Sequence, residues 1–127
     1  MKILLVDDSR TMRNIWKKVL GKIDGVEITE AEDGAEGLAA ASEQGPFDLI
    51  LLDWNMPKMD GLTMLQKVRE KKIATPVIMV TTEAEKPRII EAIKAGANNY
   101  LVKPFTPDAL QSKVEETLKK AKASAPA

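Results

Sequence analysis

Ile3-Leu4-Leu5-Val6-Asp7-Asp8 is the stretch from which the fold of this 127-residue chain can be inferred. Four apolar residues follow one another without a break and stop at two carboxylates. A continuously apolar run is typical of a strand covered on both faces, as in a parallel sheet with helices on either side. Three later runs also stop at a polar residue: residues 49–52 at Asp53, 77–80 at Thr81 and 100–102 at Lys103.

Helical patterns separate these runs. Ser9 is expected to cap a helix with one apolar face, made of Met12, Ile15, Trp16, Val19 and Leu20. Three more helices are expected after Asp33-Gly34, after Asp60-Gly61 and around Ile89, Ile90 and Ile93. Thr106-Pro107 is expected to be the N-cap and first residue of a last helix, with a stripe of Leu110, Val114 and Leu118.

A further strand is expected over residues 26–30, where apolar and polar residues alternate as in a half-exposed edge strand. Five βα units of this kind predict an α/β fold. The expected architecture is a doubly wound, five-stranded parallel sheet of order 2-1-3-4-5 with helices on both faces. We expect one domain over residues 1–122 and a frayed tail over residues 123–127.

Composition excludes several classes of function. The net charge is zero and no long basic run occurs, which argues against a nucleic-acid surface. There is no cysteine for thiol chemistry and no histidine, so a self-contained histidine kinase, phosphohistidine carrier or Ser-His-Asp hydrolase is excluded. No apolar stretch approaches the roughly 20 residues that span a bilayer. Asp7-Asp8 interrupts the first apolar run too early for a signal peptide, so a cytoplasmic protein is expected.

Polar residues at the ends of parallel strands meet at one edge of the sheet, where ligands bind in such folds. Asp7, Asp8 and Asp53 should therefore lie close together, and their mutual repulsion favours a bound cation. Mg²⁺ binds a few carboxylates together with water and phosphate oxygens. Asp8 considered alone could equally be a helix cap.

Asp53 is the expected nucleophile because it ends a central strand, and carboxylates can form acyl phosphates. Lys103 would neutralise charge on a transferring phosphoryl group, and Thr81 would donate a hydrogen bond to it. A cis Lys103-Pro104 bond in a tight turn would direct the ammonium group inward.

Two other functions use a related site. A phosphatase with an aspartyl-phosphate intermediate needs an acid/base group two residues after the nucleophile, and Asn55 cannot serve as one. A flavin-nucleotide carrier cradles phosphate in a loop after the first strand, where this chain has Asp7-Asp8 instead.

Taken together, the motifs resemble response-regulator receiver domains over essentially the whole chain, and most of all the single-domain chemotaxis regulators. The residues that carry this resemblance are Val6-Asp7-Asp8-Ser9, Asp53-Trp54-Asn55-Met56-Pro57, Met59-Asp60-Gly61, Thr81, Glu83 and Tyr100-Leu101-Val102-Lys103-Pro104-Phe105.

The resemblance implies a flavodoxin-like fold and a phosphorylation switch. Asp53 would be the phosphoacceptor, and Thr81 and Lys103 would bind the phosphoryl oxygens. Asp7, acting through water, Asp8, Asp53 and the Asn55 carbonyl would hold Mg²⁺. Asn55 and Glu83 would modulate hydrolysis.

The resemblance also implies partners. Tyr100 would be an aromatic switch on a partner-binding face that includes Arg88, Lys94 and Lys113. The phosphoryl donor would be a histidine kinase or a phosphotransfer protein. The downstream target would be the flagellar switch or another protein. A phosphatase would be a further partner, and the regulator would be a monomer. A phosphorelay intermediate or the regulator of another output remains an alternative, since Thr82, Glu85 and Pro87 depart from the chemotaxis pattern.

Overall fold

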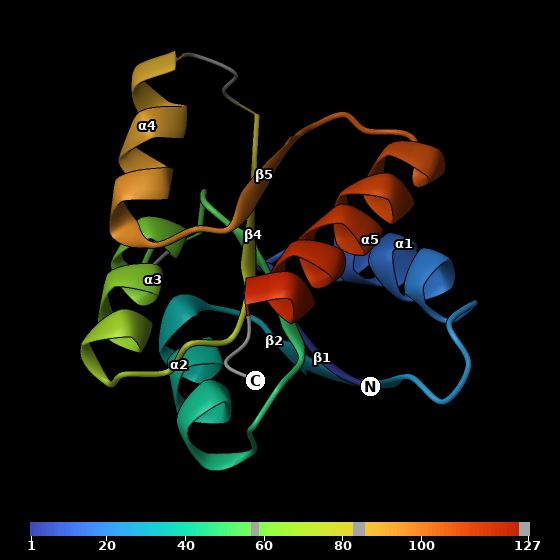
Figure 1. Ribbon diagram of the computed structural model, residues 1–127, viewed down its shortest axis with the longest axis horizontal. Helices are drawn as coiled ribbons and strands as arrows, with labels where there is room; N and C mark the ends of the chain where they lie inside the picture. Colours follow the sequence, from blue (N-terminus) through green and yellow to red (C-terminus); the bar gives the residue numbers. More distant parts are fainter. Residues whose placement is uncertain (57–58, 83–85, 125–127) are drawn as a thin grey trace.

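A computed structural model describes residues 1–56, 59–82 and 86–124 (Figure 1). Strands and helices alternate along the described chain: β1 (Lys2–Val6), α1 (Arg10–Leu20), β2 (Glu27–Ala31), α2 (Gly34–Glu43), β3 (Leu49–Asp53), α3 (Gly61–Glu70), β4 (Val77–Thr81), α4 (Lys86–Ala95), β5 (Asn99–Val102) and α5 (Pro107–Ser124). All neighbouring strands are parallel, and their order is β2-β1-β3-β4-β5. The predicted fold class and strand order are confirmed.

Helices cover both faces of the sheet (Figure 1). Helices α1 and α5 pack on one face, where Trp16 and Leu110 are fully buried. Helices α2, α3 and α4 pack on the other, where Met64 is fully buried. The three central strands are therefore enclosed on both faces, which explains why their sequences are continuously apolar.

Side-chain caps fix the starts of the helices. Ser9 accepts a hydrogen bond from the backbone N–H of Met12 at 3.2 Å, as predicted. Asp33 and Asp60 cap α2 and α3 in the same way, and Thr106 caps α5. Each cap satisfies a backbone N–H that has no partner inside its helix.

One expectation about the apolar face of α1 is wrong. Ile15 was expected on this face but is 43% exposed, whereas Arg13 is buried. The other end of the predicted face is confirmed, because Trp16, Val19 and Leu20 are buried. On α4, which the isoleucines located, Ile90 and Ile93 are 43% and 48% exposed, and Ala92 is buried.

Helix α5 ends the described part of the chain at Ser124. The single domain over residues 1–122 and the frayed tail over residues 123–127 stay predictions. Residues 125–127 lie outside the described part. Within residues 1–56, 59–82 and 86–124, no helix is long and apolar enough to cross a membrane.

Gly61 lets α3 begin directly beside the end of β3. Its N–H donates to the carbonyl of Trp54 at 2.9 Å. A Cβ added at Gly61 would lie 2.9 Å from the Cα of Trp54 and 3.0 Å from the carbonyl carbon of Asp53, and it would overlap the Asp53 oxygen. A side chain at this position must displace the backbone of the strand end.

We therefore expect Gly61→Ala to reduce the free energy of unfolding by about 3 kcal/mol, measured in urea, because overpacked backbone must move. Gly25→Ala is the control. Gly25 has φ +72° but open space around it, so its substitution should cost only about 1 kcal/mol of backbone strain. Equal stability of the two variants would contradict the close approach at Gly61.

Candidate functional site

The register of the sheet brings the predicted residues to one edge. In the pairing of β1 with β3, Asp7 and Asp53 come directly after the last pair, Val6 and Leu52, so they lie side by side. Thr81 is the last residue of β4 on the other side of β3. The backbone N–H of Lys103 donates to the Thr81 carbonyl at 2.7 Å, which places the lysine at the same edge.

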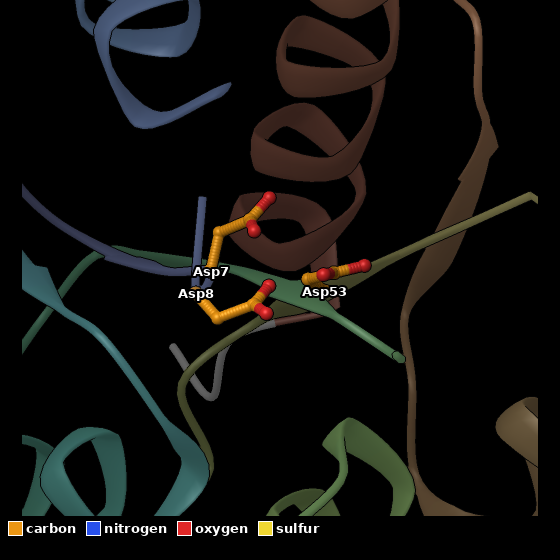
Figure 2. A group of neighbouring side chains, drawn as sticks. All are labelled: Asp7, Asp8 and Asp53. Atoms are coloured by element: carbon orange, nitrogen blue, oxygen red, sulfur yellow. The ribbon is translucent and has the colours of Figure 1, made fainter. Parts of the chain in front are cut away.

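Three carboxylates gather at this edge (Figure 2). One oxygen from each of Asp7, Asp8 and Asp53 lies within 4.8 Å of the others. The ammonium of Lys103 is 3.4 Å from Asp7 Oδ2 and 3.2 Å from Asp53 Oδ1. The Asp7 and Asp53 side chains are only 1% and 4% exposed, so this is a mostly buried group of charges.

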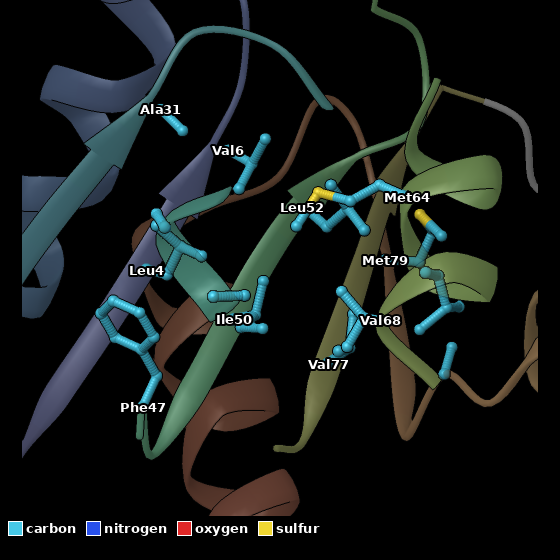
Figure 3. Close-up of a cluster of buried hydrophobic side chains, with 14 of the residues drawn as sticks. Leu4, Val6, Ala31, Phe47, Ile50, Leu52, Met64, Val68, Val77 and Met79 are labelled. Atoms are coloured by element: carbon cyan, nitrogen blue, oxygen red, sulfur yellow. The ribbon is translucent and has the colours of Figure 1, made fainter. Parts of the chain in front are cut away.

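Strand β3 holds the Asp53 backbone firmly. All five of its residues are buried, and on the face shown in Figure 3 Ile50 and Leu52 pack among side chains from the neighbouring strands and α3. The backbone N–H of Trp54 also donates to the Val80 carbonyl at 2.9 Å, which extends the pairing with β4 past Asp53. The candidate nucleophile is thus carried by one of the most enclosed segments of the sheet.

Burial and charge both act on the acids. Burial, with a further contribution from the negative charge of Asp7, raises the pKa of Asp53 to about 6, although Lys103 opposes the rise. Partial desolvation, a hydrogen bond with Asp7 and its charge raise the pKa of Asp8 above its usual range. The site therefore holds more negative charge than one lysine neutralises.

This donor set fits a hard divalent cation. Oxygen ligands from two or three carboxylates, with further positions left for water and phosphate oxygens, are what Mg²⁺ uses in phosphoryl-transfer sites. Asp8 is exposed, so it offers a ligand on the solvent side, while Asp7 and Asp53 offer buried ones. A cation here would offset the repulsion that raises the pKa of Asp53.

The sequence matches the response regulator receiver domain family over residues 3–115. The chain belongs to this family. Receiver domains are regulatory switches of two-component signalling that bind Mg²⁺ at an acidic pocket, and the strand-end acids form such a pocket here.

Relatives and solved structures agree with this assignment. The receiver domain is 48% identical to a chemotaxis protein CheY homolog of Campylobacter jejuni, covering 93% of this chain and 92% of the relative. It is 46% identical to chemotaxis protein CheY1 of Helicobacter pylori, covering 93% of this chain and 97% of the relative. The structure of Vibrio cholerae CheY4 superimposes with a TM-score of 0.84 at 37% identity, covering 91% of this chain and 97% of the CheY4 chain.

Other predicted site residues lie around the acidic pocket of the receiver domain. Thr81 is buried at the end of β4, and the exposed Asn55 donates from its amide to Thr82 Oγ1 at 3.5 Å. The Lys103-Pro104 peptide bond is cis, and the Lys103 ammonium points to the acids. Glu83, predicted to modulate hydrolysis, lies outside the described residues.

The four predicted surface residues lie on α4, β5 and α5. Tyr100 is half-buried on β5, with the Lys113 ammonium 4.9 Å from its ring centre. Lys94 is exposed on α4. Arg88 lies instead against the ring of Trp54, at 4.9 Å, which joins α4 to the residue after the candidate nucleophile.

A polar network between β5 and α5 was missed by the sequence analysis. The buried amide of Asn99 donates to Thr117 Oγ1 at 3.1 Å, and its oxygen accepts from the Lys113 ammonium at 3.3 Å. Asn99 is the first residue of β5, so it precedes the apolar run and gave no signal of this network in the sequence.

The raised pKa of Asp53 predicts how stability depends on pH without divalent cations. Its folded-state pKa, about 6, exceeds the ordinary value of 3.8, so the ionised group costs stability above pH 6, and this cost fades as pH falls toward 4. Asp53→Asn should therefore raise Tm at pH 8 by on the order of 5 °C. The gain should shrink steadily in thermal melts between pH 7 and pH 4. A gain independent of pH would contradict the raised pKa.

Proposed function

We propose that this receiver domain is a phosphorylation-activated response regulator that accepts a phosphoryl group on Asp53 in the presence of Mg²⁺. The observation that supports this most strongly is the buried Asp53 carboxylate, held beside Asp7 and within 3.2 Å of the Lys103 ammonium. A carboxylate, a set of cation ligands and a fixed positive charge are the three groups that phosphoryl transfer to an acid requires.

In the transfer, an oxygen of Asp53 attacks the phosphorus of a phosphohistidine on a partner protein. The new O–P bond forms as the P–N bond breaks, and the imidazole leaves with the bonding electron pair. When bound, Mg²⁺ would be held by Asp7, Asp8, Asp53 and the Asn55 carbonyl and would neutralise negative charge on the phosphoryl oxygens. Lys103 and the Thr81 hydroxyl would bind those oxygens.

Two properties of the chain suit an acceptor that is not a hydrolytic enzyme. It has no histidine, so the phosphohistidine must belong to a histidine kinase or phosphotransfer protein. Asn55, beside the site, carries an amide rather than a carboxylate, so it cannot act as a general base on water. The receiver domain assists its own phosphorylation, and dephosphorylation is slow, with Asn55 and Glu83 setting its rate and a partner phosphatase accelerating it.

Phosphorylation acts by shifting a two-state equilibrium. Thr81 moves toward the phosphoryl group, and Tyr100 turns inward on the face formed by α4, β5 and α5. Moving the population from mostly inactive to mostly active takes about 5 kcal/mol of differential interaction, shared among the metal, Thr81, Lys103 and Tyr100. Arg88, Lys94 and Lys113 belong to the face that the downstream partner binds.

The output is a chemotaxis response in the cytoplasm, with the flagellar switch as the target of the monomeric regulator. The names of the relatives from Campylobacter jejuni and Helicobacter pylori support this pathway. A receiver that relays phosphate to a second histidine protein is the alternative. Proteins captured by the beryllofluoride-treated domain, but not by the untreated domain, would separate the two.

Acetyl phosphate or beryllofluoride with Mg²⁺ should change the fluorescence of Trp54, the residue after Asp53. Asp53→Asn should abolish this change and the incorporation of labelled phosphate, because the amide is not a nucleophile. Asp33→Asn is the matched control, since Asp33 caps α2, is not among the three clustered acids, and asparagine caps about as well. A response of Asp53→Asn equal to that of wild type would show that Asp53 is not the acceptor.

Mg²⁺ should raise the Tm of the wild-type protein, because a ligand that binds only the folded state stabilises it by mass action. Asp8→Ala should melt a few degrees higher than wild type without Mg²⁺, since one repelling charge is gone, and should lose most of the Mg²⁺-induced shift. Asp24→Ala removes the same charge from an exposed turn and should respond to Mg²⁺ as wild type does. An unchanged response of Asp8→Ala would exclude Asp8 as a ligand.

A further inference from the structure

Arg13 is a buried cation that the proposed chemistry does not use. It lies on α1 and is only 5% exposed. Its Nη1 donates to the backbone carbonyl of Asp7 at 2.6 Å in a buried hydrogen bond. Its Nε donates to Glu30 Oε1 at 3.1 Å, and Nη2 lies 3.8 Å from Glu32 Oε1. One guanidinium group thus joins α1, the end of β1 and the end of β2.

The Asp7 carbonyl belongs to the peptide that joins Asp7 to Asp8, the two acids on this side of the pocket. Rotation of that peptide would move both carboxylates. Its neighbouring groups are also fixed, because the Asp7 N–H donates to the Ala31 carbonyl at 3.2 Å and the Ser9 N–H donates to Asp7 Oδ1 at 2.9 Å. The bond from Arg13 holds the carbonyl of this peptide itself.

Glu30 and Glu32 hold Arg13 in place. Although partial burial raises its pKa, hydrogen bonds from Lys17 and Arg13 keep the pKa of Glu30 below its usual value, so it is an anion at neutral pH. A guanidinium has several donors in a planar fork, so it can bond the carbonyl and a carboxylate at once. Lys17 also bonds Glu30, at 3.2 Å, and within the described part of the chain its ammonium forms no ion pair with Asp7, Asp8 or Asp53.

From this arrangement we infer that Arg13 is a positioning residue for cation binding, which sets the Asp7-Asp8 peptide so that both carboxylates face the Asp53 pocket. The inference rests on the proposed function only in requiring that the pocket binds Mg²⁺. Hydrogen-bond partners that orient metal ligands commonly change metal affinity 10- to 100-fold when they are removed.

The charge of Arg13 and its positioning role predict opposite changes in Mg²⁺ affinity when the residue is substituted. A cation near a metal site repels the metal, so a variant that lost only the charge of Arg13 would bind Mg²⁺ more tightly. A variant that lost the orientation of the Asp7-Asp8 peptide would bind it more weakly. The direction of the change therefore distinguishes the two roles.

The test is titration of MgCl₂ into the whole chain by isothermal titration calorimetry, with wild type, Arg13→Met and Lys17→Met in parallel. Arg13→Met should weaken Mg²⁺ binding roughly tenfold while keeping a cooperative thermal melt. Lys17→Met removes the same charge and a bond to the same glutamate, and it should stay within about twofold of wild type because that exposed charge is screened. The rise in Tm at fixed Mg²⁺ should shrink in Arg13→Met alone.

Arg13→Lys is the second variant, in case Arg13→Met does not fold. It keeps the charge, but a single ammonium cannot reproduce the fork, so affinity should fall by about threefold or more. Unchanged or tighter binding in the folded Arg13 variants would overturn the inference, as would equal weakening in Lys17→Met. Absence of Mg²⁺ binding in wild type would instead contradict the metal site of the proposed function.

Discussion

Two buried carboxylates, Asp7 and Asp53, share one ammonium group at the edge of the sheet, and this imbalance of charge governs the site. Lys103 lies within 3.4 Å of both, yet burial and the charge of Asp7 still raise the pKa of Asp53. Carboxylates in such a place repel each other unless a proton or a cation intervenes. The fold holds them together at some cost in stability, which makes the pocket ready for a ligand of high positive charge.

The surrounding architecture supplies the rigidity that this arrangement needs. Strand β3 is buried along its whole length, and Gly61 allows α3 to begin against the carbonyl of Asp53. The Asp7 side is anchored differently, by Arg13 from α1 and by backbone pairing with β2. One acid is therefore fixed by packing and the other by hydrogen bonds. A substitution at Arg13 on α1 can therefore alter the geometry of the pocket as directly as a substitution in β3.

The strands and the site could be predicted because both leave strong local signals. Apolar runs that stop at Asp7, Asp53, Thr81 and Lys103 locate four strand ends, and a parallel sheet then brings these ends to one edge. The buried face of a helix is set by tertiary packing, which spacing alone does not encode. For this reason Ile15 was expected on the apolar face of α1 and is exposed. Arg13 and Asn99 were missed because a polar residue in the sequence shows nothing of the buried partners that satisfy it.

The ion pair between Lys103 and Asp7 joins residues 96 positions apart in the chain. Closing so long a loop is entropically costly, so contacts of this kind form late in folding. During synthesis the lysine also emerges after the first four strands have been made. The acids come from β1 and β3, and the lysine joins them only when the last βα unit has docked on the same sheet. The Lys103 ion pairs therefore mark a sheet assembled from both ends of the chain, and a copy truncated before β5 would keep the repelling acids without their counter-charge.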